Sequence, residues 1–133
     1  RSSDLFVGIC APLVRDVVIA GINRDELTAI VILDLDGCRL INPALASGDI
    51  AAAANDPLVR AAFRERFARV LASATGSSNR IARAILLDAP LSIDRGEVTD
   101  KGSINQRAVL EHRTDIIDAL YAPVPPASVI TSI

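Results

Sequence analysis

Apolar residues along the chain gather in short runs that polar turns separate. Residues 5–13 form an apolar segment that predicts a first helix ending near Pro12. Residues 17–20 are rich in β-branched side chains and predict a strand. Residues 27–35 are almost continuously apolar and predict a second, buried strand. The polar stretch 21–26 between the two carries turn residues, so the strands are expected to form a hairpin.

The clearest helix is predicted to begin at Asp56, a good N-cap residue, with Pro57 in the first helical position. Its apolar residues recur at helical spacing and share one face: they are Val59, Phe63, Phe67 and Val70. The arginines of this segment, together with Glu65, are interpreted as its solvated face. Upstream, residues 36–55 are less regular, and a helical turn is expected only at 49–54.

The remaining elements follow after a glycine- and serine-containing break. Residues 81–87 predict a third strand, and the capping-box pattern of residues 103–106 opens a last helix that ends at Pro123. The inner face of that helix is expected to carry Val109, Ile116 and Leu120. This order of elements predicts an α+β fold: a small, mostly antiparallel three-stranded sheet with helices packed on it. We assign residues 1–122 to this domain and residues 123–133 to a Pro-rich tail.

Composition narrows the classes of protein to which the chain can belong. A length of 133 residues suits one domain, and a hydrophobic share of 50% is enough for a proper core. A net charge of −2 without a long basic run argues against nucleic acid as a partner, because phosphate binding usually needs a basic face. No apolar stretch approaches the roughly 20 residues that cross a bilayer, and no signal peptide is visible. We therefore expect a cytoplasmic protein without a membrane or nucleic-acid partner.

Most of the candidate reactive residues have a plain structural interpretation. His112 is the only histidine, and its place on the last helix indicates a packing or surface residue. Cys10 and Cys38 stand in apolar surroundings, where a thiolate is disfavoured, and are interpreted as buried free thiols. The acidic residues of the loop before the last helix lack the spacing of a calcium-binding loop: they are Asp94, Glu97 and Asp100. No metal site is predicted.

Lys101 is the only lysine of the chain, beside 13 arginines. It stands in the polar stretch 92–103, between an apolar run and the start of the last helix. A lysine ammonium is a compact, rotatable point charge, whereas an arginine is a rigid planar fork. A loop can deliver such a group into a neighbouring site. The alternative is that Lys101 is an ordinary solvated loop residue.

Two segments carry a resemblance to a known family. Residues 96–110 read Gly-Glu-Val-Thr-Asp-Lys-Gly-Ser-Ile-Asn-Gln-Arg-Ala-Val-Leu. They resemble the lysine region of feruloyl-CoA synthase-like enzymes, in the adenylate-forming acyl-CoA synthetase superfamily. Residues 11–21 resemble the start of that family's small C-terminal domain, and the similar order of elements spans roughly residues 5–122. Most of the superfamily places glycine directly before the lysine; here Asp100 precedes it and Gly102 follows it, which fits the feruloyl-type branch better than the general pattern.

The resemblance implies that the chain is the C-terminal lid domain of an ATP-dependent acyl- or aryl-CoA synthetase, separated from its N-terminal adenylation domain. It implies that Lys101 is catalytic: its ammonium would offset negative charge while a carboxylate attacks ATP to form an acyl-adenylate. Rotation of the lid would then withdraw Lys101 before the thiol of CoA attacks. The full-length enzyme would use ATP, Mg and CoA with a carboxylic acid, a hydroxycinnamate being one candidate. Cofactor-binding residues are not identified, and the isolated chain is expected to hold no cofactor and to be inactive.

A second hypothesis belongs to another class of protein. The chain could be a stand-alone small α+β module that binds a ligand or a partner without catalysis, with Lys101 on a solvated loop. An open reading frame that continues upstream into an AMP-binding motif would favour the enzyme. A start codon directly before Arg1 would favour the module.

Overall fold

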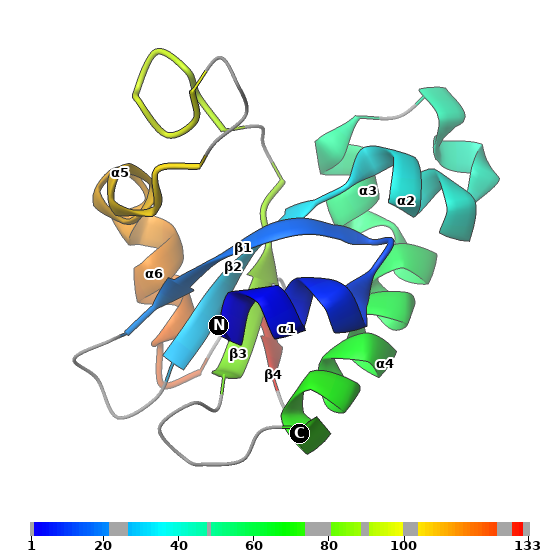
Figure 1. Ribbon diagram of the computed structural model, residues 1–133, viewed down its shortest axis with the longest axis horizontal. Coiled ribbons are helices and arrows are strands. Elements are labelled where there is room, and N and C mark those ends of the chain that lie inside the picture. Colours follow the sequence, from blue (N-terminus) through cyan, green and yellow to red (C-terminus); the bar gives the residue numbers. More distant parts are fainter. Residues whose placement is uncertain are drawn as a thin grey trace.

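A sheet with helices on both faces forms the described part of the molecule (Figure 1). The computed structural model describes residues 2–21, 27–47, 49–73, 81–88, 91–99, 104–124 and 129–131. In chain order the elements are α1 (Ser2–Cys10), β1 (Val14–Ala20), β2 (Leu27–Leu33), α2 (Leu35–Ile41), the 3-10 helix η1 (Pro43–Ser47), α3 (Ile50–Asn55), α4 (Pro57–Ser73), β3 (Ile81–Leu86), α5 (Gln106–His112), α6 (Thr114–Leu120) and β4 (Val129–Thr131). None of the described helices is long and apolar enough to cross a membrane.

The strands lie in the order β1-β2-β3-β4. β1 pairs antiparallel with β2, with Val17 opposite Val31, which agrees with the predicted hairpin. β2 and β3 run parallel, and β3 pairs antiparallel with β4. The segment from α2 to α4 connects the two parallel strands. The α+β prediction is confirmed, and antiparallel pairing predominates in the described sheet, as expected.

The predicted number of three strands is too small, because the described sheet has four. The additional strand is β4, which lies in the segment that the sequence pattern assigned to a Pro-rich tail. Val129 and Ile130 are β-branched and almost fully buried against the core. A strand of three residues leaves no periodic pattern, and its stability comes from pairing with β3, whose partner Ala84 faces Ile130.

The core consists of two apolar clusters, one on each face of the sheet. Ala29 and Val31 of β2 belong to the cluster under α1 and α4, whereas Ile30 belongs to the cluster under α5 and α6. This alternation is the period-two pattern of a strand buried on both faces. The first cluster contains three aromatic rings whose centroids lie 5.6 to 6.1 Å apart: Phe6, Phe63 and Phe67. The predicted apolar stripe of α4 is therefore confirmed.

Helix α2 is an element that the sequence pattern did not predict. Asp34 caps it by accepting a hydrogen bond from the Gly37 amide at 3.2 Å. A glycine in a sequence usually suggests the interruption of a helix, but here Gly37 allows helix α2 to approach the turn after α1 closely. A Cβ atom at this position would lie 1.7 Å from the carbonyl oxygen of Pro12. The glycine is thus required by packing between two segments that are far apart in the sequence.

The predicted last helix is divided into α5 and α6. Asn105, and not Ser103 as the capping-box pattern predicted, is the N-cap, and its side chain accepts a hydrogen bond from the Ala108 amide at 3.2 Å; Ser103 itself lies outside the described residues. Arg113 interrupts the helix with φ −122° and ψ 43°. Val109 and Leu120, one in each half, are buried against the sheet as predicted.

Candidate functional site

The loop between β3 and α5 is the candidate site, because the sequence places Lys101 there. Lys101 and its neighbours at 100–103 lie outside the described residues, so the site is defined by the residues that flank them. Val98 and Ile104 form an antiparallel bridge with one another. The two ends of the lysine segment, which we define as residues 98–104, therefore meet at one point of the fold.

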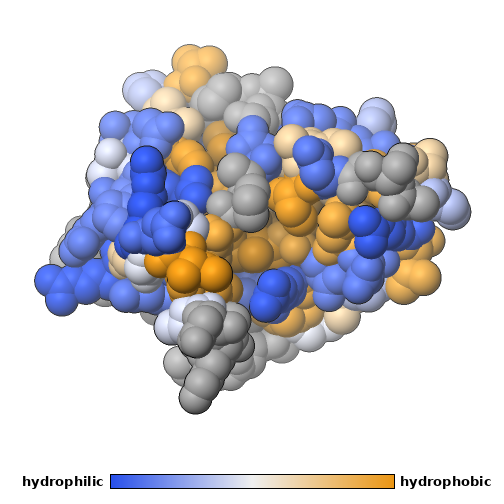
Figure 2. Space-filling model, turned by 90° about the horizontal axis from the view of Figure 1, so that it is seen from above, coloured by the Kyte–Doolittle hydropathy of each residue, from blue (hydrophilic) through white to orange (hydrophobic). Residues whose placement is uncertain are grey.

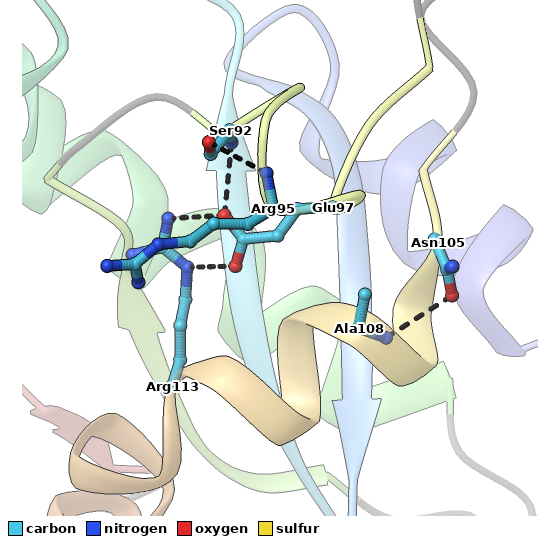
Figure 3. Close-up of polar contacts among 6 residues, drawn as sticks. All are labelled: Ser92, Arg95, Glu97, Asn105, Ala108 and Arg113. Atoms are coloured by element: carbon cyan, nitrogen blue, oxygen red, sulfur yellow. Dashed lines mark hydrogen bonds and ion pairs between the residues drawn. The ribbon is translucent and has the colours of Figure 1, made fainter.

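Glu97, directly before the lysine segment, is fully buried and its carboxylate accepts three hydrogen bonds (Figure 3). Arg113 donates two of them, from Nε to Oε2 and from Nη2 to Oε1, each at 2.9 Å. The amide of Ser92 donates the third, to Oε1 at 3.0 Å. The ion pair is bidentate, which is the strongest geometry that an arginine and a carboxylate form.

The Glu97 carboxyl has a pKa below its ordinary value. Burial alone would raise this pKa, because it penalises the charged form. The hydrogen bonds from Arg113 and the Ser92 amide, together with the charge of Arg113 and a smaller electrostatic effect of His112, act in the opposite direction and prevail. Glu97 is therefore a carboxylate at neutral pH, and its charge is compensated within the fold.

The main chain of Glu97 adds two further connections. Its amide donates to the Ser92 carbonyl at 3.0 Å, and its carbonyl accepts from the Asn105 amide at 2.9 Å. The turn from Ser92 to Glu97 contains Gly96, whose φ of 72° favours glycine. The same turn is closed by the Arg95 amide, which donates to Ser92 Oγ at 3.2 Å (Figure 3). Through Asn105 at its start and Arg113 at its end, α5 is thus joined at both ends to Glu97.

The structure separates the acidic loop residues that the sequence grouped together. Asp94 is exposed and Glu97 is buried, whereas Asp100 lies outside the described residues. Glu97 is therefore a buried and paired residue and not a solvated loop residue. No local pattern could have revealed it, because its partner Arg113 lies 16 positions away. His112 is exposed in the last turn of α5.

The two cysteines are buried, as the sequence predicted. Burial raises the pKa of the Cys10 thiol to about 12, and the charge of nearby Arg66 opposes part of this rise. Burial also raises the pKa of the Cys38 thiol to about 11, and the negative charges of Asp34 and Asp56 add to the effect. Neither group is suited to act as a nucleophile at neutral pH.

A concave feature lies where β2 ends, beside the start of β1. It is an open cleft of about 410 Å³, lined by Arg15, Leu33, Asp34, Leu35, Asp36, Arg39 and Ile50. Figure 2 looks down on the side of the molecule where β2 and β3 end, and shows apolar residues in the middle of the view with polar residues around them. Arg39 already pairs with Asp36 at 3.0 Å, and Asp34 caps α2. The cleft therefore presents charges of both signs and favours no single class of ligand.

Similarity to known proteins is found at the level of three-dimensional structure. No family model matches the chain, and no curated protein sequence matches it either. The adenylation domain of the carboxylate reductase from Mycobacterium chelonae has a TM-score of 0.60 and 21% identity, over 91% of this chain and 17% of that chain. A second similar structure is that of a carboxylic acid reductase didomain, which consists of the adenylation domain and the carrier protein, from Segniliparus rugosus in complex with AMP. It has a TM-score of 0.55 and 23% identity, over 90% of this chain and 15% of that chain.

A further structure comes from the same reductase. The adenylation domain of the Segniliparus rugosus enzyme, in complex with AMP and a co-purified carboxylic acid, has a TM-score of 0.56 and 21% identity, over 88% of this chain and 17% of that chain. At these identities the likeness establishes the fold. Nearly all of this chain is matched, but it spans only a small part of each of these larger proteins.

Proposed function

We propose that this chain is the C-terminal lid domain of an adenylate-forming enzyme that activates a carboxylic acid with ATP. The observation that carries the proposal is the match of 91% of this chain to 17% of a carboxylate reductase adenylation domain. A domain of this fold that corresponds to one part of a larger adenylation domain is expected to act together with the rest of it. The resemblance of residues 96–110 to the lysine region of acyl-CoA synthetases supports the same conclusion independently.

In this proposal Lys101 is the adenylation lysine. An oxygen of the substrate carboxylate bonds to the α-phosphorus of ATP, and the bond to the bridging oxygen of pyrophosphate breaks. Both reactants are anionic, and negative charge moves through the transition state towards the leaving group. A protonated Lys101 held near these oxygens offsets that charge at the moment when it shifts. We assign to Lys101 this electrostatic role and no proton transfer.

In the second half of the proposed reaction, the thiol of CoA attacks the acyl carbon of the acyl-adenylate, and the thioester forms as AMP and a proton leave. The branch that residues 96–110 resemble makes CoA thioesters, and a hydroxycinnamate is our candidate acid. Rotation of the lid withdraws Lys101 after adenylation and admits the thiol, so one domain serves both steps. Among the described residues, no three His, Cys, Asp or Glu side chains gather as a metal site would require. In this proposal Mg binds together with ATP in the full-length enzyme.

The test separates the two half-reactions in the full-length enzyme. Lys101→Ala should lower the rate of ATP–pyrophosphate exchange by about 10² to 10³, on the scale of comparable electrostatic contacts. Lys101→Arg should restore little of it, because a planar fork does not replace a point charge. Thioester formation from a synthetic acyl-adenylate and CoA should be largely retained. Arg107→Ala, which removes an exposed cation of α5, is the matched control and should change neither rate.

Two results would overturn the proposal. If Lys101→Ala slows both half-reactions equally, the lysine has no specific part in adenylation. If it slows neither, Lys101 is a solvated loop residue, and the non-catalytic binding module becomes the better explanation.

A further inference from the structure

We propose that the buried Glu97–Arg113 pair positions Lys101, by fixing the base of the lysine segment to helix α5. The inference rests on the proposed function and concerns how the same site works. Glu97 and Arg113 are positioning residues in this scheme, because they act on the reaction through Lys101.

The first step of the argument is the path of the chain. Residues 98 and 104 pair with one another, so the two ends of the lysine segment lie at the same place in the fold. Directly before this point, Glu97 is held by the Ser92 amide and by Arg113. Directly after it, Asn105 donates its amide to the Glu97 carbonyl and caps α5. Both ends of the lysine segment are therefore attached to one residue, Glu97.

The second step concerns burial and charge. The side chains of Arg113 and Glu97 are 16% and 0% exposed, whereas those of Arg107 and Glu111 on the same helix are 88% and 61% exposed. An exposed pair contributes little and can exchange with water. A buried pair cannot be rearranged without leaving an uncompensated charge in the interior, so it permits one arrangement of the segments that it joins.

The third step connects the pair to the body of the domain. Arg113 stands between α5 and α6, and the buried residues Val109 and Leu120 hold these two helices against the sheet. Glu97 is thus attached to helices that pack on the sheet, so the two ends of the lysine segment should move with the whole domain when the lid rotates. Accurate placement matters, because displacing a reacting group by about 1 Å can cost roughly 10²-fold in rate.

The same geometry excludes a direct chemical role for Glu97. Its carboxylate is fully buried, and both oxygens already accept hydrogen bonds within the fold. A group enclosed in this way does not contact a substrate that another domain holds. Its influence on the reaction must pass through the position of Lys101.

The experiment uses the full-length enzyme with the variants Glu97→Gln and Arg113→Lys. Glu97→Gln keeps the shape of the side chain and removes its charge, so kcat of adenylation should fall by about 10- to 10²-fold. KM for ATP and for the acid should change little, because their pockets lie in the other domain in the proposed function. Thioester formation from the synthetic acyl-adenylate should be retained. Arg113→Lys keeps the positive charge but cannot form the bidentate contact. Its kcat of adenylation should therefore lie between that of Glu97→Gln and that of the wild type.

Glu111→Gln makes the same substitution on an exposed pair of α5 and should leave every rate unchanged. Amide hydrogen exchange gives a readout that does not depend on activity. Peptides that cover residues 98–104 should exchange faster in Glu97→Gln than in Glu111→Gln, while peptides of β2 remain protected. All rates are measured well below the melting temperature of each variant, so that unfolding does not contribute.

The outcomes distinguish the inference from the function on which it rests. If Lys101→Ala abolishes adenylation but Glu97→Gln does not slow it, the inference is wrong and the proposed function stands. If Glu97→Gln slows both half-reactions equally, the pair is only a structural contact and the inference is again wrong. If Lys101→Ala has no effect, the proposed function and the inference fall together.

Discussion

Replacing Arg113 by methionine should destabilise the isolated domain strongly at neutral pH, and this loss should shrink as the pH falls. Methionine replaces the unbranched aliphatic stem of Arg113 but ends where the guanidinium begins, so it removes every donor that Arg113 gives to Glu97. Glu97 then remains buried with the Ser92 amide as its remaining partner among the three described hydrogen bonds. The perturbation therefore leaves the carboxylate in place and removes its compensating charge.

The magnitude follows from two ways in which the folded variant can respond. Leaving a buried charge unpaired costs about 3–5 kcal/mol. Alternatively, the carboxyl takes up a proton. From an ordinary pKa of about 4.3, this costs about 3.7 kcal/mol near pH 7, at about 1.36 kcal/mol per pH unit. The domain adopts the cheaper response, so we expect a loss of about 3–4 kcal/mol in the free energy of unfolding.

The pH dependence of this loss has a definite sign. In the wild type the pKa of Glu97 is lowered, so the pair stabilises the fold above the pKa of the unfolded chain and loses its effect as the pH falls through the folded pKa. In Arg113→Met, burial dominates and the folded pKa of Glu97 is raised. The deficit should therefore be largest near neutral pH and should decrease as the pH approaches the unfolded pKa.

Urea denaturation followed by far-UV circular dichroism, at about pH 7 and about pH 5, measures both effects. Arg107→Met removes an arginine from the exposed pair of α5 and should cost no more than about 0.5 kcal/mol. Adding Glu97→Gln to Arg113→Met should remove the pH dependence that is specific to the variant. A loss below about 1 kcal/mol, equal at the two pH values, would refute the reasoning.

Two further predictions concern the packing around α2 and α1. Gly37→Ala should lower the melting temperature markedly, because the new Cβ would lie 1.7 Å from the carbonyl oxygen of Pro12. Gly8→Ala is the control: its new Cβ meets no atom within 4 Å, so it should be neutral or should stabilise the fold by up to about 1 kcal/mol. Equal melting temperatures for the two variants would contradict the described contact. The thiols of Cys10 and Cys38 should react slowly with a maleimide at neutral pH, because burial raises their pKa values to about 12 and about 11, and unfolding in urea should accelerate the reaction. Rapid labelling of the folded protein would show that these side chains are accessible.

The sequence predicted those elements whose stability depends on a regular pattern. Helix α4 was predicted because Val59, Phe63 and Phe67 recur at helical spacing and all three are buried. Helix α2 and strand β4 were missed for a common reason. Gly37 looks like a break until Pro12 is brought against it, and residues 129–131 are too few to form a pattern until β3 lies beside them. Both elements depend on contacts between distant parts of the chain.

In the candidate site, too, one residue could be recognised from the local sequence and another only from contacts between distant parts of the chain. Lys101 was singled out because it is the only lysine and because its surroundings resemble a known family. The importance of Glu97 could not be predicted, since it depends on Arg113 reaching the carboxylate after α5 has packed on the sheet. A charged loop residue and a buried anchor have the same appearance in a sequence.

The two outer strands of the described sheet offer little to a neighbouring molecule. Edge strands carry unpaired main-chain groups that can recruit a strand from another copy and begin aggregation. The register of β1 shifts between Val14 and Asp16, and the Asp16 carboxylate accepts the Val17 amide hydrogen at 2.8 Å, so a main-chain donor of this edge is occupied from within. The opposite edge is β4, with only three residues. Such edges disfavour strand pairing between copies of this chain and so lower its tendency to aggregate through the described sheet.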